Sequence, residues 1–194
     1  MKTLAKIIRI ITIAPIMALL LITLLLILRP EAYNGLYMYF VCFACLCVIP
    51  SLSYPIEKKW HWCGKFHPDF DGRKSSRRLA IYFSLFGYAV LTLISFLTHQ
   101  PRLINVLCLT YLFSGFLIFL FSVVIKYDAS GHACGFIGPV AFLSYNVNWY
   151  FLFLLPLFLV IFWSSLKLNR HSVEQVLLGG IFPVVSMIIA LLIL

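Results

Sequence analysis

Apolar runs nearly as long as a membrane is thick recur throughout this chain of 194 residues. An α-helix rises about 1.5 Å per residue, so roughly 20 apolar residues cross the hydrocarbon core of a bilayer. Segments of this kind cover residues 4–28, 36–52, 79–97, 103–125, 132–145, 149–166 and 173–194. We therefore predict an all-α fold, a polytopic transmembrane helical bundle with six or seven spans.

The first and fifth segments decide between six and seven spans. Residues 132–145 are the shortest segment and could cross only by tilting or by thinning the bilayer. Residues 4–28 contain Pro15, which a packed transmembrane helix tolerates when its neighbours satisfy the freed carbonyl. Lys2 and Lys6 come before a long apolar run, as in a signal peptide, but no small-residue cleavage pattern follows, so we expect a retained anchor. If that anchor lies at the interface, six spans remain.

The composition excludes a water-soluble fold. With 63% hydrophobic and 11% charged residues, the chain has too few polar side chains to cover its apolar ones in water. The net charge of +9 does not indicate nucleic acid, because the charges edge a membrane and no soluble module could carry base recognition. We expect membrane lipids as partners, in particular anionic ones, and no nucleic acid. The oligomeric state is left open.

The chain has no linker-like tract, low-complexity tract or internal repeat, so we expect one integral membrane domain over residues 1–194. Within it we expect an N-terminal helical hairpin (1–54), a basic polar loop (55–78) and a helical core (79–194).

The cysteines suggest neither a disulfide framework nor a cofactor. Most of them lie inside apolar segments, where cysteine behaves as a small hydrophobe: Cys42, Cys45, Cys47 and Cys108. In the polar loop, His61, Cys63 and His67 could hold zinc, but a fourth ligand is not evident and loop packing is the favoured interpretation. We expect no metal and no cofactor.

Two histidines near predicted helix ends are the candidate chemical groups. Ser130 can cap a helix, and Gly131 lets the backbone approach a ligand closely. The amides of the following turn would face an anion beside His132. In the next hairpin, His171 precedes Glu174 and Gln175, which lie three and four residues on and could orient its imidazole. The alternative is that both imidazoles are ordinary interfacial side chains.

These residues resemble a known family. Ser130-Gly131-His132, and His171 followed by Gln175-Val-Leu-Leu-Gly179, resemble the signatures P-S-G-H and S-R-x5-H-x3-D of the type 2 phosphatidic acid phosphatase superfamily of membrane phosphatases. The resemblance covers residues 71–180. It implies an active site at one membrane face, where His171 is the nucleophile and is phosphorylated transiently. His132 would protonate the leaving group, and Ser130 and Gly131 would cradle the phosphate.

The chain departs from the family pattern at several positions. The first family signature, K-x6-R-P, is not intact, and residues 71–78 stand in its place. The phosphate ligands there would be Arg73 and either Arg77 or Arg78. Ala129 replaces the proline, Gln175 replaces the aspartate, and Ser165 stands where the family has an arginine. Lys167 or Arg170 would then have to supply the missing positive charge. The fat-storage-inducing transmembrane proteins resemble the chain more loosely, through a similar histidine pair.

Orientation follows from the basic residues. Seven spans would place every Lys and Arg except Arg29 and Arg102 on the face that carries the two histidines. The positive-inside rule assigns that face to the cytosol, although arginines recruited to bind phosphate would create the same imbalance. We expect a multi-pass protein of a bacterial inner membrane with its active-site face in the cytosol.

The resulting hypothesis is a metal-independent lipid phosphatase that cleaves a phosphate monoester or diphosphate through a phosphohistidine. The alternative is a phospholipid-binding or scaffold protein of the same fold with little or no activity. A transporter whose histidines relay protons is a third possibility. It predicts ionisable residues near the middle of the bilayer, and none lies deep within a predicted span.

Overall fold

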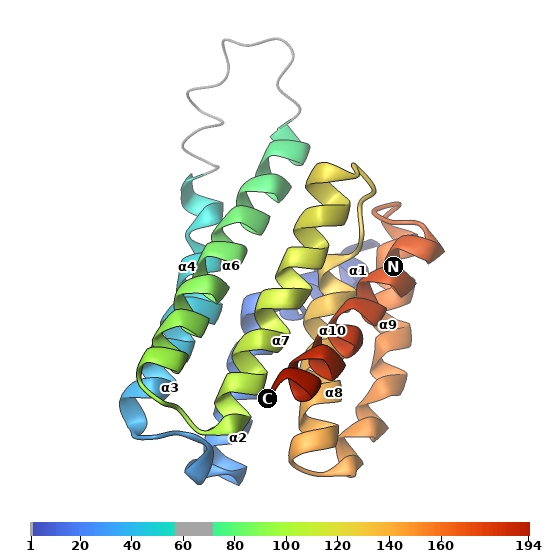
Figure 1. Cartoon of the computed structure of the whole chain (residues 1–194). Coiled ribbons are helices and arrows are strands. Elements are labelled where there is room, and N and C mark those ends of the chain that lie inside the picture. Colours follow the sequence, from blue (N-terminus) through green and yellow to red (C-terminus); the bar gives the residue numbers. More distant parts are fainter. Residues whose placement is uncertain (1, 57–71) are drawn as a thin grey trace.

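The computed structural model describes residues 2–56 and 72–194, except for the side chains of residues 2, 6 and 72–75. All regular elements in these residues are helical, and they form one bundle (Figure 1). The first part of the chain contains α1 (Lys2–Ile11), α2 (Ala14–Leu28), the 3-10 turn η1 (Pro30–Ala32), α3 (Leu36–Phe43), the π-helical turn η2 (Ala44–Val48) and α4 (Ile49–Ser51). The second part contains α6 (Gly72–Leu97), α7 (Arg102–Phe119), the π-helical turn η4 (Leu120–Val124), α8 (Gly131–Asn146), the 3-10 turn η5 (Trp149–Leu154), α9 (Leu155–Lys167) and α10 (Val173–Ile193).

Several helices are long and apolar enough to cross a membrane. In the described part of the chain, 5 continuous helical stretches qualify: Leu36–Ile56, Ser76–Leu97, Arg102–Val124, Trp149–Lys167 and Val173–Ile193. The predicted all-α class is therefore confirmed for these residues, and the helices are consistent with a multi-pass membrane bundle. The predicted fifth span corresponds to α8, whose 16 residues are shorter than the stretches that qualify.

The first predicted span is not one continuous helix. Helices α1 and α2 meet at a 46° bend, and the two together qualify as one broken span or as a re-entrant segment. Pro15 explains the break, because its ring has no N–H to donate and would clash with the carbonyl of Ile11. Helix α1 ends at Ile11, and Ile13 is extended before α2 begins. Counting this pair as one span gives a total of 6, the lower end of the predicted range.

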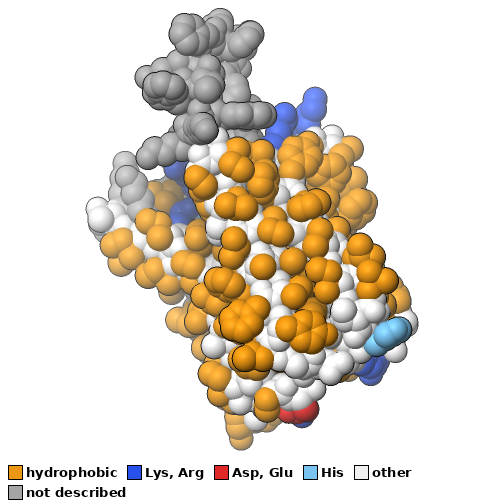
Figure 2. Space-filling model, turned by 90° about the vertical axis from the view of Figure 1, so that its left-hand side faces the viewer, with side chains coloured by type: hydrophobic (Ala, Val, Ile, Leu, Met, Phe, Trp, Pro, Cys, Tyr) orange, Lys and Arg blue, Asp and Glu red, His pale blue; other side chains and the backbone are white. Residues whose placement is uncertain are grey.

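The bundle surface suits lipid. The middle of the face in Figure 2 is covered by hydrophobic side chains, whereas Lys and Arg gather at its upper end. On α6, Phe86, Leu93 and Leu97 each expose more than half of their side-chain surface. Such outward-facing apolar residues would be costly in water and are favoured in a hydrocarbon core.

The polar turns lie together at one end of the bundle. The segment between η4 and α8, the turn between α9 and α10, and the start of α6 are all at the top of Figure 1. Arg29 and Arg102 are at the other end, where they donate to the carbonyls of Asn146 and Leu191. These three polar segments, distant in sequence, therefore share one end of the bundle.

Candidate functional site

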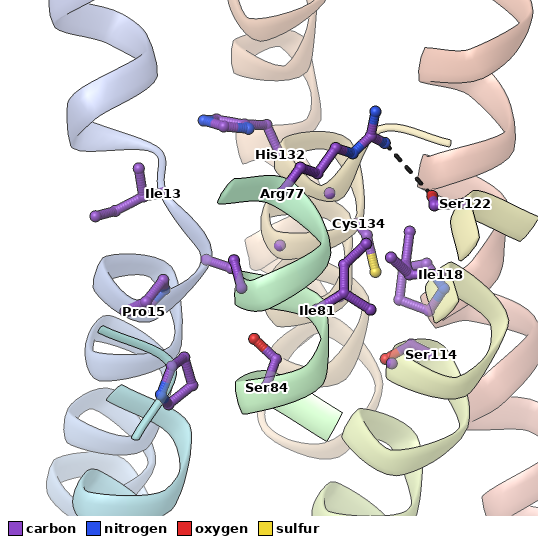
Figure 3. A pocket seen from close by; sticks show the side chains of 18 of the residues that line it. Ile13, Pro15, Arg77, Ile81, Ser84, Ser114, Ile118, Ser122, His132 and Cys134 are labelled. Atoms are coloured by element: carbon purple, nitrogen blue, oxygen red, sulfur yellow. Dashed lines mark hydrogen bonds between the residues drawn. The ribbon is translucent and has the colours of Figure 1, made fainter. Parts of the chain in front are cut away.

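A cavity of ≈ 920 Å³ extends from the polar end of the bundle into its interior. Figure 3 shows His132 and Arg77 at one end of it, with Ile81 and Ile118 further in. The charged and imidazole-bearing residues that line the cavity are Arg9, Arg77, Arg78, Lys126, Asp128, His132, Arg170 and His171. Its deeper part is lined mainly by apolar and small residues from α2, α6, α7, α8 and α10. The cavity therefore joins a cationic mouth to an apolar interior.

His171 lies in the turn before α10, and its ring orientation is fixed by the backbone. Its Nδ1 is 3.2 Å from the carbonyl oxygen of Asp128. Because a carbonyl can only accept, the hydrogen bond places the ring proton on Nδ1. In the neutral ring, Nε2 then carries a free lone pair. A histidine that attacks an electrophile needs this tautomer.

The surroundings of His171 keep its imidazole neutral. Burial lowers the pKa of His171 to about 4, and the positive charges of Arg77 and Arg9 act in the same direction. Contacts with the Gln175 side chain and the Asp128 carbonyl oppose this shift of the pKa without cancelling it. Near neutral pH, His171 is therefore an unprotonated base with an available nitrogen lone pair.

The start of α8 is built as the sequence predicts. Ser130 is fully buried, and its hydroxyl accepts a hydrogen bond from the Ala133 amide at 3.4 Å, which confirms the predicted N-cap. Its own amide donates to the carbonyl of Gln175 at 2.9 Å. A Cβ atom at Gly179 would overlap the Ser130 carbonyl, so only glycine allows α10 to come this close. The two histidine-bearing segments are thereby joined through their backbones.

Gly131 presents open backbone to the cavity. A Cβ atom added there would meet no heavy atom within 4 Å, and the residue is on the cavity lining. Ser130, which the resemblance also assigns to the phosphate cradle, is fully buried and is not on the cavity lining. The space in front of the first turn of α8 is consistent with the predicted cradle for an anion.

Arg77 is held in place by the segment that precedes α8. Its guanidinium donates to the Ala129 carbonyl at 2.6 Å and forms an ion pair with Asp128 at 3.0 Å. It also reaches the hydroxyl of Ser122 in the π-helical turn η4, at 3.4 Å (Figure 3). The extra residue per turn in a π-helix often marks a functional position, and here it lies beside the cavity.

Both ring nitrogens of His132 contact Arg9. Its Nε2 lies 3.2 Å from the Arg9 carbonyl, and its Nδ1 lies 3.5 Å from the Arg9 guanidinium. The carbonyl can only accept and the guanidinium can only donate, so the proton of this neutral ring is on Nε2. In Figure 3 the ring of His132 points away from Arg77.

Only some of the other predicted site residues lie at the cavity. Arg78 and Arg170 line the cavity, whereas Lys167, in the last turn of α9, does not. The Glu174 carboxylate accepts a hydrogen bond from the Tyr127 hydroxyl at 3.1 Å instead of reaching His171. Gln175 forms a capping box with Ser172. The Arg73 side chain is outside the described residues.

Two residues of the site were missed from the sequence. Arg9 precedes the region that resembles the phosphatases, and its signal was a charge within an otherwise apolar run. The role of Asp128 had no sequence signal, because its backbone carbonyl makes the contact with His171. That carbonyl is presented by a turn that begins at Lys126 with a φ of 62°.

The zinc hypothesis cannot be placed in this fold, because His61, Cys63 and His67 lie outside the described residues. Among residues that are described, no three His, Cys, Asp or Glu side chains form a metal-binding group.

Comparisons with known proteins assign no family to this chain. No family model, curated protein or solved structure matches it.

Proposed function

We propose that the chain is a membrane-embedded phosphatase that hydrolyses a phosphate monoester or diphosphate of a lipid. His171 would be the nucleophile and form a phosphohistidine. The observation that carries this proposal is the hydrogen bond from His171 Nδ1 to the Asp128 carbonyl, which leaves Nε2 unprotonated in a residue that lines the cavity. An isolated interfacial histidine would not need its tautomer fixed.

The charges around the cavity support a phosphate ligand. The described side chains of its lining include five basic residues, Arg9, Arg77, Arg78, Lys126 and Arg170, against a single carboxylate, Asp128. Asp128 is already paired with Arg77. An anion with several oxygens would balance the remaining positive charge, and planar guanidinium groups suit phosphate oxygens well.

The apolar depth of the cavity supports a lipid as the rest of the substrate. Ile81, Ile118 and Phe142 line the cavity below its charged mouth. An apolar lining can take up the hydrocarbon of a lipid from the bilayer without exposing it to water. A phosphorylated lipid would thus place its headgroup among the arginines and its chain in the interior.

The chemistry can be written with protons and bonds balanced. A phosphate ester monoanion enters and transfers its proton to His132 Nδ1 once the Arg9 guanidinium has turned away. His171 Nε2 attacks phosphorus, the bond from phosphorus to the ester oxygen breaks, and His132 protonates that oxygen. Water then attacks the phosphohistidine and gives a proton to His132 as the bond from phosphorus to His171 Nε2 breaks. His132 passes this proton to the departing inorganic phosphate, so both histidines return to their neutral starting forms. The arginines stabilise the charge that develops on the phosphoryl oxygens.

A second function is phospholipid binding without hydrolysis. Both ring nitrogens of His132 are occupied by Arg9 in this structure. A histidine that stayed in this arrangement could not protonate a leaving group. The same cavity would then hold a lipid headgroup without turnover.

Phosphate release distinguishes the two functions. Purified protein in vesicles would be assayed with phosphatidic acid, phosphatidylglycerophosphate and undecaprenyl diphosphate. We expect hydrolysis of at least one of them by the wild type and none above background by His171→Ala. The matched control is His99→Asn, since His99 is exposed in the turn between α6 and α7, and this turn is at the end of the bundle away from the cavity. Equal rates for wild type and His171→Ala would exclude the proposed chemistry.

A further inference from the structure

The Arg9 guanidinium on the cavity lining is incompletely satisfied by the described part of the fold. Its Nη1 atom is buried and has no hydrogen-bond partner. Its Nη2 atom makes only the long contact of 3.5 Å with His132 Nδ1. Guanidinium remains charged at any physiological pH and carries five N–H donors. A buried charge without partners is costly, so a complementary group is needed when the site is filled.

The described part of the fold offers Arg9 no carboxylate at the cavity. Asp128 pairs with Arg77 at 3.0 Å, and the remaining charged residues on the lining are basic. Arg77 and Arg170 both lie close enough to Arg9 to repel it electrostatically. An anionic ligand in the cavity would supply the counter-charge that these described residues do not.

We infer that Arg9 is a ligand of the phosphate anion and that binding of the anion releases His132 for proton transfer. The first half of this inference, that Arg9 binds an anion, does not depend on the proposed function. The second half, that anion binding releases His132 for proton transfer, rests on the proposed function. Helix α1 packs along α9, which carries Ser165 at the position where the resembling family has an arginine. Arg9 would supply a positive charge there from the neighbouring helix.

Anion binding and the release of His132 are coupled because Arg9 contacts both ring nitrogens of His132. The Arg9 carbonyl keeps the ring proton on Nε2, and the guanidinium covers the lone pair of Nδ1. A phosphate oxygen that draws the guanidinium toward itself uncovers Nδ1. The protonated phosphate ester can then pass its proton to Nδ1. His132 therefore becomes a proton donor only when substrate is bound. Arg9 is therefore a binding residue for phosphate and a positioning residue for His132.

Binding of inorganic phosphate tests the first half without any turnover. Protein carrying His171→Ala would be titrated with phosphate and followed by phosphorus-31 NMR or calorimetry. Adding Arg9→Ala should weaken binding by at least about tenfold, since a charge-assisted hydrogen bond is lost. Arg9→Lys, which keeps the charge but not the fork, should give an intermediate affinity, and millimolar guanidinium should restore part of the binding lost in Arg9→Ala. The matched control is Arg102→Ala, at the opposite end of the bundle, which should bind like its parent.

The second half is tested by varying the leaving group in the His171-containing protein. Arg9→Lys should lower kcat for an alkyl phosphate more than for p-nitrophenyl phosphate, whose leaving group needs no protonation. A purely structural role for Arg9 would lower both rates by the same factor. Equal factors would therefore overturn the coupling of Arg9 to His132.

The outcomes separate this inference from the proposed function. Phosphate binding that depends on Arg9, in a protein that hydrolyses nothing, would support Arg9 as an anion ligand while excluding the phosphatase. Hydrolysis by the wild type with phosphate binding unaffected by Arg9→Ala and Arg9→Lys would overturn the inference and leave the phosphatase standing. If Arg9→Ala does not fold as a monodisperse protein, Arg9→Lys alone decides, and parental affinity in that variant would overturn the role of the guanidinium.

Discussion

At the scale of single residues, the proton positions on the two histidines determine what each can do. The Asp128 carbonyl leaves His171 with a free Nε2, whereas the Arg9 carbonyl gives His132 the opposite tautomer. The two rings are therefore not equivalent before any substrate arrives. In the proposed mechanism His171 can attack directly, whereas His132 must first gain a proton.

The first prediction concerns the pH dependence of hydrolysis. Burial lowers the pKa of His171 to about 4, and only the neutral form can attack. Activity should therefore persist as the pH falls through 6.5, the usual pKa of histidine, and should disappear as it falls through about 4. Arg77→Gln removes a positive charge that lowers the pKa of His171, so the acidic limb of kcat/KM should move to higher pH. Both proteins would be measured with the same substrate, so that its own ionisation contributes equally.

The control for this profile is Arg102→Ala, which removes a positive charge at the far end of the bundle. The acidic limb of its pH profile of kcat/KM should coincide with that of the wild type. A limb near pH 6.5 in all three proteins would show that His171 is not the titrating group.

A second prediction tests the open backbone at Gly131. A methyl group there meets no protein atom, so Gly131→Ala should leave the free energy of unfolding within about 1 kcal/mol of the wild type. The methyl group would occupy space intended for the phosphate, and kcat/KM should fall by about tenfold or more, since small displacements of reacting atoms are costly. Thermal unfolding and phosphate release, measured on the same preparation, check both parts. Unchanged kcat/KM would place the phosphate elsewhere.

At the scale of the elements, the site depends on how closely α10 approaches the start of α8. The Ser130 amide donates to the Gln175 carbonyl, and Gly179 lies against the Ser130 backbone. This contact sets the separation between the segments that carry His132 and His171. The packing of two helices is thus a determinant of the chemistry.

Gly179→Ala should separate these segments. The added Cβ overlaps the Ser130 carbonyl, so we expect a loss of about 1–3 kcal/mol in stability and a large loss of activity. The adjacent Gly180→Ala is a matched control, because its Cβ would be 3.5 Å from Ile137 and 3.6 Å from Phe158, which are ordinary contacts. Thermal unfolding in detergent and phosphate release would be compared for both. Similar values for the two variants would refute the close approach at Gly179.

The sequence predicted elements better than the contacts between them. Apolar length located most helices, and Ser130 was correctly assigned as a cap because capping is a local interaction. The bend before α2 was missed because Pro15 can be tolerated in a packed span, and only the packing decides whether the helix breaks. Arg9 was missed because 123 residues separate it from His132 along the chain. The Asp128 contact uses a backbone atom, which no side-chain pattern reveals.

At the scale of the whole molecule, charge is distributed unequally between the two ends of the bundle. The basic residues of the cavity are at one end, and Arg29 and Arg102 are at the other. The positive-inside rule leads us to propose that the cavity end faces the cytosol, even though the proposed phosphate binding would account for part of the imbalance.

Single-cysteine labelling tests this orientation. In a background without exposed cysteines, Val173→Cys would mark the cavity end and Glu31→Cys the opposite end, since both positions are exposed. An impermeant thiol reagent added to intact cells should label Glu31→Cys and spare Val173→Cys until the membrane is opened. The reverse pattern would place the cavity outside the cell.

The central claim is that His171 carries the phosphoryl group during turnover. Protein in vesicles would be mixed with lipid labelled in its phosphate, quenched in alkali within milliseconds to seconds, and digested for mass spectrometry. We predict an alkali-stable, acid-labile phosphate on the peptide containing His171, formed at a rate that accounts for phosphate release and lost in His171→Ala. Release of phosphate at the wild-type rate by His171→Ala, or labelling of another residue, would contradict the account.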